Sequence, residues 1–331
     1  MIDAAIISDL HLTDKKADEF KWKVFPWIQE VIEEHAFDDL FIMGDLFDKK
    51  DRHPAELVNR LVQELRPIRK IVPITILMGN HDYFKPDHPF LQFIDDLPNI
   101  TFITQPVEYK GALWLPHERN PEEAWKDIDI INQETIFLHQ SIIGSITSNY
   151  FELNHGISST YFKDSKASIY SGDIHVPQVV GNVTYIGTPY PVAFGDHYTP
   201  RAVLLRDGGM DSVTMKTIQK LSISIEHPDE LENWKIYKGD QAIVKVTLPE
   251  SDLHNWIKYR NQVKAYFKDI GADLHDLKLK KIESAKDKTK PGTKDSQTIL
   301  TWDKEDVLKK FATSEKLSKE SLAIGMELLN G

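Results

Sequence analysis

The chain contains no cysteine, which excludes a disulfide framework and any thiolate metal site. It also contains no apolar run near the roughly 18 residues that a membrane-spanning helix needs. A strand-like apolar pattern starts directly after the first residues, and no basic leader precedes it. Together these absences predict a soluble, cytoplasmic protein with no membrane partner.

An excess of positive charge is missing as well, since 40 Lys and Arg stand against 51 Asp and Glu, for a formal net charge of -11. Proteins that hold DNA through counterion release need local Lys and Arg. Any contact with DNA is therefore expected to be local and metal-assisted, or to come from a partner. The stretch 278–294 holds seven lysines, and its composition favours a solvated, flexible linker over a dedicated DNA-binding strip.

Five short motifs do stand out, each after an apolar, β-branched run. They are SDLHL at 8–12, GDLFD at 44–48, GNHD at 79–82, LHQ at 138–140 and SGDIH at 171–175. In an α/β sheet, functional residues gather beyond the carboxyl ends of strands, so these loops can converge. They offer carboxylate, imidazole and amide groups, which suit Mn²⁺ or Mg²⁺ better than a structural zinc cage. We expect an open catalytic centre with two divalent ions, Mn²⁺ before Mg²⁺.

Two ions about 4 Å apart can share a carboxylate, activate a water and neutralise phosphoryl charge during in-line displacement. Asp45 is the natural bridging residue. A single DxH or GDxxD is common by chance, and it is the joint, ordered occurrence of the motifs that carries the prediction. Among the other histidines, His53 follows Asp48 by five residues. It is either a substrate contact or a surface neighbour of a helix cap.

In order and wording the motifs resemble the calcineurin-like metallophosphoesterases and, within them, the SbcD-type nuclease subunits of DNA double-strand-break repair. The resemblance covers about residues 1–200 and extends less specifically over the rest. It implies two sets of metal ligands: Asp9, His11, Asp45 and His175 for the first ion, and Asp45, Asn80, His139 and Asp173 for the second. It also implies that His81 donates a proton to the leaving oxygen or stabilises the transition state, and that Asp82 orients the His81 imidazole.

One position departs from this family pattern, because the usual GHxH reads Gly172, Asp173, Ile174, His175 here. A carboxylate can coordinate Mn²⁺ or Mg²⁺, but it adds a negative charge to a site that must bind an anion. We expect activity to be retained. A metal centre impaired by Asp173 is the alternative.

The expected fold is α/β, a metallophosphoesterase β-sandwich flanked by helices, with a small α+β capping domain and a C-terminal helical pair. We place the nuclease domain at 1–215, the capping, DNA-positioning domain at 220–282, a basic linker at 283–300 and the C-terminal helices at 301–331. Apolar spacing predicts helices at 18–35, 54–69, 89–96 and 251–270, and strands at 182–187, 201–206, 212–218, 242–248 and 273–282. The segment GTPYP at 187–191 is expected to form a wall beside the metals.

The resemblance also implies partners. Residues 301–331 would bind the coiled-coil base of an SbcC-type ATPase. A homodimer contact would use Leu57, Leu61 and Leu65 with Phe90, Phe93 and Ile94, unless these side chains pack on their own sheet. Aromatic and basic residues interleave at Trp256, Lys258, Tyr259, Arg260 and Lys264. They would contact a DNA backbone or simply form an amphipathic helix.

From these residues we predict a metal-dependent DNA nuclease, with exonuclease and endonuclease activity, that serves an SbcCD-like repair or recombination complex. The compact length suggests a bacteriophage version, which would act in the host cytoplasm. Two other functions stay open. The chain could be a phosphatase or cyclic-nucleotide phosphodiesterase for small substrates, or a catalytically impaired adaptor that holds an SbcC-type ATPase on DNA.

Overall fold

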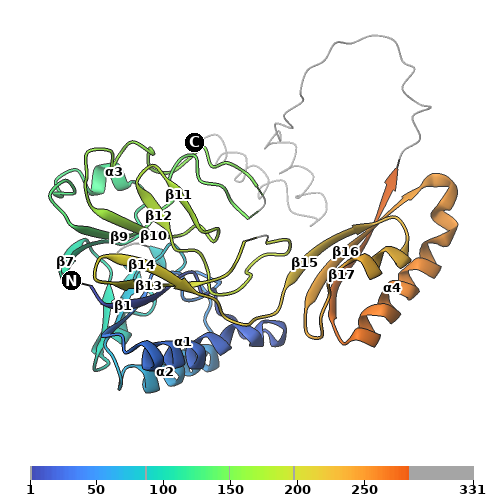
Figure 1. The fold of residues 1–331 in the computed structure, drawn as a ribbon, viewed down its shortest axis with the longest axis horizontal. Helices are drawn as coiled ribbons and strands as arrows, with labels where there is room; N and C mark the ends of the chain where they lie inside the picture. The colour runs from blue at the N-terminus through green and yellow to red at the C-terminus, as the bar shows by residue number, and fades with distance from the viewer. Residues whose placement is uncertain (1, 86–87, 149, 197, 283–331) are drawn as a thin grey trace, which may run out of the picture. The chain divides into compact units, whose positions relative to one another are not determined.

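The computed structural model describes residues 2–85, 88–148, 150–196 and 198–282 (Figure 1). The predicted linker at 283–300 and the predicted helices within 301–331 lie outside the described residues. Residues 1–282 form one compact unit. Within the described residues, no helix combines the length and the apolar character needed to cross a membrane.

Two six-stranded sheets form the first part of the chain. The first has the order β14-β13-β1-β2-β3-β6, built from Gly209–Val213, Ala202–Arg206, Ala4–Ile7, Asp39–Ile42, Ile74–Leu77 and Ile100–Ile103. The second has the order β11-β12-β10-β9-β8-β7, built from Gln178–Val180, Val183–Tyr185, Ser168–Gly172, Thr135–His139, Ala112–Leu115 and Val107–Tyr109. Parallel pairing joins β1, β2, β3 and β6 in one sheet and β8, β9, β10 and β12 in the other.

The sheets face each other across a shared core, as the period-two alternation of their strands requires. In β1, Ala4 and Ile6 point into this core, while Ala5 and Ile7 point to the opposite face. Phe41, Trp114 and Phe137 meet in the centre of the core, with ring centroids 4.5 to 5.3 Å apart. This is the predicted β-sandwich, and a short helix, α3 (Pro121–Ala124), follows β8.

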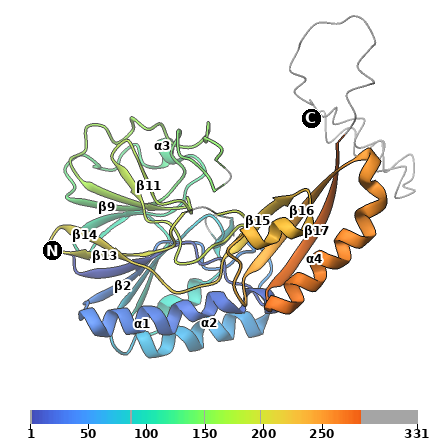
Figure 2. The ribbon, with the colours of Figure 1, turned by 45° about the vertical axis from the view of Figure 1, so that its right-hand side comes forward.

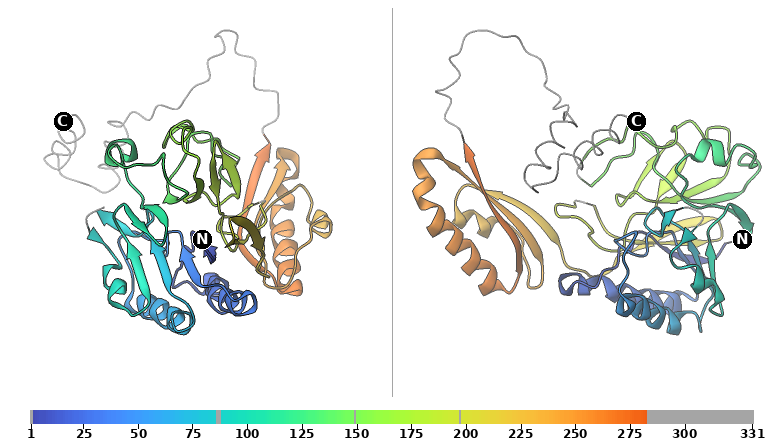
Figure 3. Two further views of the ribbon diagram at one scale, coloured as in Figure 1. Left: turned by 60° about the vertical axis from the view of Figure 1, so that its left-hand side comes forward. Right: turned by 180° about the vertical axis from the view of Figure 1, so that it is seen from behind.

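Two helices, α1 (Val24–His35) and α2 (Ala55–Ile68), lie together against the outer face of the first sheet (Figures 1 and 3). A 3-10 helix, η1 (Lys16–Lys23), precedes α1. The helix predicted at 18–35 is therefore two elements. Pro26 falls in the first turn of α1, where its missing N–H costs no helical hydrogen bond. The leucine spacing left open what α2 packs against, and in the structure α2 packs against the first sheet.

This packing rules out a dimer contact through the α2 leucines, and the alternative, that they pack on their own sheet, holds. Leu57, Leu61 and Leu65 are buried in the chain's own core, and Ile94 is fully buried too. None of these side chains can face a second copy. Phe90 and Phe93 remain exposed, at 41% and 44%.

Two other expected elements differ in the structure. Residues 89–96 were predicted as a helix, but form the end of a small hairpin, β4 (Tyr83–Lys85) and β5 (His88–Pro89), followed by a 3-10 turn, η2 (Gln92–Asp96). Pro89 pairs with Tyr83 in this hairpin, so only the 3-10 turn at 92–96 remains, which is too short for a stable helix. The strand predicted at 212–218 ends at Val213, because the chain then turns Met215 into the core.

The segment predicted as the capping domain, residues 220–282, which we call the capping unit, has a parallel sheet of its own in the order β15-β16-β17. Its elements are β15 (Lys220–Ile225), η3 (Pro228–Asn233), β16 (Gln241–Pro249), η4 (Glu250–Asn255), α4 (Trp256–Ile270) and β17 (Asp273–Ile282). Helix α4 runs along one face of this sheet (Figure 2). The helix predicted at 251–270 thus begins as a 3-10 turn, and its aromatic residues Trp256 and Tyr259 pack inward while its basic residues stay exposed.

Candidate metal centre

The five sequence motifs meet at one place, beyond the carboxyl ends of strands from both sheets. The loops after β1, β2 and β3 carry Asp9 and His11, Asp45, and Asn80 and His81. From the second sheet, His139 ends β9, and Asp173 and His175 follow β10. The convergence expected from strand polarity is therefore what the fold produces.

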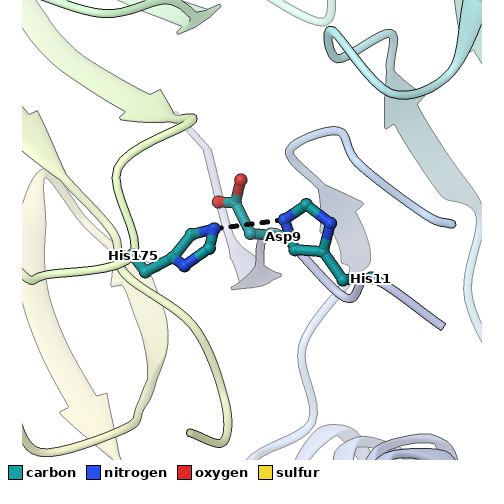
Figure 4. A group of neighbouring side chains, drawn as sticks. All are labelled: Asp9, His11 and His175. Atoms are coloured by element: carbon teal, nitrogen blue, oxygen red, sulfur yellow. Dashed lines mark hydrogen bonds between the residues drawn. The ribbon is translucent and has the colours of Figure 1, made fainter. Parts of the chain in front are cut away.

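Asp9, His11 and His175 form one group of possible metal ligands, with one donor atom from each lying within 4.8 Å of the others (Figure 4). The Nε2 atoms of His11 and His175 face each other 3.1 Å apart. Burial lowers the pKa of both imidazoles, and the His175 ring lowers that of His11 further. Both rings are therefore held neutral, which is the form in which histidine binds a metal.

A second group joins Asp9, Asp45 and His139. The His139 Nδ1–H donates to the Met43 carbonyl at 2.6 Å, which fixes the tautomer and leaves the Nε2 lone pair free. This Nε2 atom lies 3.4 Å from Asp45 Oδ1 and 4.0 Å from Asp9 Oδ1. It is buried and has no hydrogen-bond partner in the described part of the chain.

The carboxylates of this group lack a compensating charge. Burial raises the pKa of Asp9 to about 8, against an opposing effect of His139, and raises that of Asp45 well above its usual range, with Asp82 adding to the rise. A bare lone pair aimed at buried carboxylates needs positive charge between them, which either a shared proton or a metal cation can supply. The donor set therefore fits divalent metal ions.

Asp45, a member of the second group, also reaches the first. Its Oδ2 is 3.6 Å from His11 Nε2, and its Oδ1 is 3.4 Å from His139 Nε2 and accepts the His81 backbone N–H at 2.8 Å. One carboxylate thus reaches both donor sets, which is the geometry of a bridging ligand. Asn80 supplies an amide oxygen, Oδ1, that is buried and has no hydrogen-bond partner among the described residues.

Asp173, the residue that departs from the family pattern, faces the same centre. Its Oδ1 lies 3.8 Å from His139 Nε2, and its backbone N–H donates to Asp9 Oδ1 at 3.1 Å. The Ser141 hydroxyl donates to the other carboxylate oxygen, Oδ2. One oxygen is thus held by a neighbour while the other faces the donors of the second group.

His81 and Asp82 make different contacts, and the expected contact of Asp82 with the His81 imidazole is not the one that the structure shows. His81 stands beside His11, with ring centroids 4.8 Å apart, and its Nδ1 donates to the Asp48 backbone carbonyl at 2.7 Å. That carbonyl orients the imidazole, not Asp82. Burial lowers the pKa of His81, and the Asp48 contact opposes the shift.

The Asp82 carboxylate is used to shape the loops. Its Oδ2 accepts the N–H groups of Asp45 at 2.8 Å and Gly79 at 2.7 Å, and its Oδ1 accepts the Leu46 N–H at 2.9 Å. All of these groups are buried. Asp82 therefore ties the second motif to the third and sets the position of Asp45.

The glycines of the motifs let these loops approach closely. A Cβ built on Gly44 would lie 2.3 Å from His139 Nδ1, and one on Gly79 would lie 2.3 Å from Asp45 Oδ1. A side chain at either position would displace a predicted ligand. The motif glycines therefore serve close packing as well as the turn itself.

Sequence reasoning missed several contributors. His117 follows β8, and its Nδ1 is hydrogen-bonded to the Tyr83 hydroxyl at 2.7 Å, with its ring 6.3 Å from that of His139. Lys21 Nζ donates to the His11 carbonyl at 2.7 Å. Neither residue belongs to a motif, so only the fold brings them here. In the segment 187–191, predicted to form a wall beside the metals, the Tyr190 hydroxyl donates to the Leu10 carbonyl.

His53 lies in a small pocket beside the centre, lined also by Lys15, Asp48 and Arg52. Its ring packs on Phe47 and Phe90, with centroids 4.8 and 3.7 Å away. The imidazole is half-buried between aromatic rings, which is more specific than the surface neighbour of a helix cap that the sequence allowed.

Comparison with known proteins gives three findings. The sequence profile described as Calcineurin-like phosphoesterase matches residues 3–275. The chain is 26% identical over 219 residues to Exonuclease subunit 1 of Enterobacteria phage T4, a match that covers 61% of this chain and spans only 63% of that relative's length. Among solved structures, a Pseudomonas putida nuclease MPE is similar with a TM-score of 0.36 and 14% identity, covering 63% of this chain and 87% of that one.

Proposed function

Because the chain belongs to the calcineurin-like phosphoesterase family, we propose that it is a metal-dependent phosphodiesterase that cleaves DNA. The observation that carries this proposal is the buried cluster in which imidazole nitrogens and carboxylates face one another, and in which none of the described residues donates a hydrogen bond to the His139 Nε2 atom. Such a cluster costs free energy unless cations bind it.

The proposed ligands form two overlapping sets: Asp9, His11, Asp45 and His175, and Asp45, Asn80, His139 and Asp173. We propose two divalent ions, Mn²⁺ with Mg²⁺ as the alternative, since the donors are oxygen and imidazole nitrogen. When bound, two such ions supply an activated water and neutralise charge on the phosphoryl oxygens.

His81 is proposed to act on the leaving oxygen. With Nδ1–H held by the Asp48 carbonyl, Nε2 is the atom left to exchange a proton with substrate. Burial keeps this imidazole neutral in the absence of substrate. An approaching phosphodiester anion favours the imidazolium form, so that Nε2–H can donate to the leaving oxygen as the bond breaks.

DNA is proposed as the substrate on two grounds. The T4 relative is an exonuclease subunit by its name, and α4 exposes Lys258, Arg260 and Lys264, which could contact a phosphate backbone. We further propose that residues 301–331 bind an SbcC-type ATPase and that Phe90 and Phe93 contribute to a homodimer. The first of these rests on the sequence alone.

The test is cleavage of end-labelled double-stranded and single-stranded DNA by the purified chain in Mn²⁺, with bound metal determined. His81→Ala is compared with His155→Ala, which removes an exposed imidazole. We expect cleavage by the chain and the control, and none by His81→Ala. A small phosphoester is assayed in parallel, and rapid turnover of that compound with intact DNA would replace the nuclease by a phosphatase.

Failure of cleavage has two readings that metal content separates. Fewer than two ions bound per chain, with intact binding of an SbcC-type ATPase, would favour an adaptor whose centre is impaired by Asp173. Two ions bound without cleavage would be followed by the same assay with that ATPase and ATP, and persistent inactivity there would refute the nuclease proposal.

A further inference from the structure

Three charged residues are buried beside the metal centre without belonging to it. Asp18 is 8% exposed, Lys21 is 3% exposed and Lys220 is 8% exposed. Buried charges of this kind are costly, and well-packed apolar residues would often stabilise a fold as much or more. Two cations and one anion in such a place therefore call for a role other than stability.

Lys21 holds the backbone of a proposed metal ligand. Its Nζ donates to the His11 carbonyl at 2.7 Å and lies 4.0 Å from Asp18 Oδ1. His11 has a φ of 41° and Asp9 a φ of 54°, conformations that cost free energy in residues other than glycine. The surrounding structure must hold this loop in place.

The hydrogen bonds of the loop show how it is held. On one side the N–H groups of Asp9, His11 and Leu12 donate to the carbonyls of 44, 45 and 46, at 3.1, 2.9 and 2.9 Å. On the other side the Leu10 carbonyl accepts the Tyr190 hydroxyl, and the His11 carbonyl accepts Lys21. Lys21 is thus the side chain that holds the carbonyl of the imidazole-bearing residue itself.

Asp18 connects Lys21 to the capping unit. Its Oδ2 accepts the Thr13 hydroxyl at 2.8 Å, and its Oδ1 lies 3.5 Å from Lys220 Nζ. Lys220 is the first residue of β15, and its Nζ also donates to the Val192 carbonyl at 3.2 Å. A second tie runs from β16, where Gln241 Nε2 donates to the Ala17 carbonyl at 2.5 Å.

We propose that Lys21 and Asp18 are positioning residues for His11. We further propose that Lys220 makes this positioning depend on where the capping unit lies against the rest of residues 1–282. The route is continuous: the first residue of β15 contacts Asp18, Asp18 pairs with Lys21, and Lys21 holds the His11 carbonyl. A shift of the capping sheet therefore alters the ligand loop. The proposal rests on the proposed function only in taking His11 as a metal ligand.

The first experiment compares Lys21→Met with Lys23→Met, which removes an exposed lysine of the same 3-10 helix. Mn²⁺ binding is measured by calorimetry, and the metal-free chains are compared by thermal midpoint and by hydrogen exchange of residues 9–12. We expect binding about 10- to 100-fold weaker in Lys21→Met, as for other groups that orient ligands. Exchange at 9–12 should be faster. The thermal midpoint should fall below that of the control, because Asp18 and the His11 carbonyl lose a buried partner, so both affinities are measured well below the two midpoints.

Equal Mn²⁺ affinity in the two variants would overturn the role of Lys21. The second experiment uses Lys220→Met, which touches no residue of the ligand loop. We expect a loss of Mn²⁺ affinity of at least about twofold, and a double variant with Lys21→Met that is no weaker than Lys21→Met alone. An unchanged affinity or strictly additive losses would overturn the link to the capping unit.

A third variant keeps the proposal testable should Lys21→Met fail to fold. Asp18→Asn retains the size of the side chain and its hydrogen-bonding oxygen but removes the charge that pairs both lysines, so it should weaken Mn²⁺ binding in the same way. Unaltered binding in Asp18→Asn would refute the proposal. These readouts contain no DNA, so a chain that binds Mn²⁺ normally but cleaves no DNA would sink the proposed function and leave this inference standing.

Discussion

Replacing Asp82 by asparagine separates the role that the structure gives this residue from the role that the sequence suggested. The carboxylate accepts three buried backbone N–H groups, from Asp45, Leu46 and Gly79. Hydrogen bonds to a charged group contribute about 1.5–3 kcal/mol each. Asparagine keeps one oxygen but turns an NH₂ donor toward a backbone N–H donor, so at least one of the three contacts is replaced by a repulsion between donors.

We therefore expect Asp82→Asn to lower the free energy of unfolding of the metal-free chain by about 3–5 kcal/mol. Urea denaturation measures this, and the slope with denaturant should be unchanged if only stability is affected. The matched control is Asp95→Asn, where Oδ1 accepts the Phe102 N–H at 2.9 Å near the surface. It should lose about 1 kcal/mol.

The reasoning would be refuted by a particular pattern. Asp82→Asn would have to be as stable as Asp95→Asn and bind Mn²⁺ normally, yet lose DNA cleavage. Asp82 would then act on His81, as the sequence suggested, and the three N–H contacts would be incidental to it.

Three further predictions follow from the same structure. Gly79→Ala should destabilise the chain by about 2–3 kcal/mol in urea denaturation. It should also weaken Mn²⁺ binding, because the new Cβ meets Asp45. Gly209→Ala, in an exposed hairpin, should do neither, and equal behaviour of the two variants would contradict the packing argument. A double Phe90→Glu, Phe93→Glu variant should sediment as a monomer, and Phe84→Glu, on the same hairpin, should not change the mass; a wild-type chain that is itself monomeric would end the dimer proposal. Chelation should lower the thermal midpoint relative to the chain in Mn²⁺ at 100 times its dissociation constant, where binding stabilises by about 2.7 kcal/mol; an unchanged midpoint would mean that the folded chain does not bind the ion preferentially.

The sequence predicted the chemistry of the site better than its contacts. Each ligand motif lies at the carboxyl end of a strand, so strand polarity predicted that Asp9 and Asp45 meet at one edge of their sheet. His139 joins them because the second sheet packs face to face on the first. The hydrogen-bond partners of Asp82 could not be predicted in this way, because Asp82 and Asp48 are both near His81 in space. Only the path of the loop decides that the Asp48 carbonyl takes the imidazole while Asp82 takes three backbone groups.

The limits at the level of the fold have similar causes. An amphipathic helix shows that one face is covered but not by what, so the leucines of α2 could have faced a second copy or the chain's own sheet. Local structure also competes with pattern, because the hairpin that pairs Pro89 with Tyr83 takes the start of the helix expected at 89–96. The burial of Lys21 could not be predicted, since a lysine in a polar segment is expected to be solvated and only the fold buries it. The predicted ATPase-binding helices at 301–331 stay a prediction.

The two sheets contribute to the metal centre almost equally, and this has a consequence for how the chain unfolds. Asp9, His11 and Asp45 extend from one sheet, and His139, Asp173 and His175 from the other. Bound ions would therefore clamp the open end of the sandwich, so that neither layer could detach without releasing them. The metal-loaded chain should lose both layers in one cooperative transition, while in the apo chain the layers are held together by the core around Trp114 and by hydrogen bonds such as that from His139 to the Met43 carbonyl.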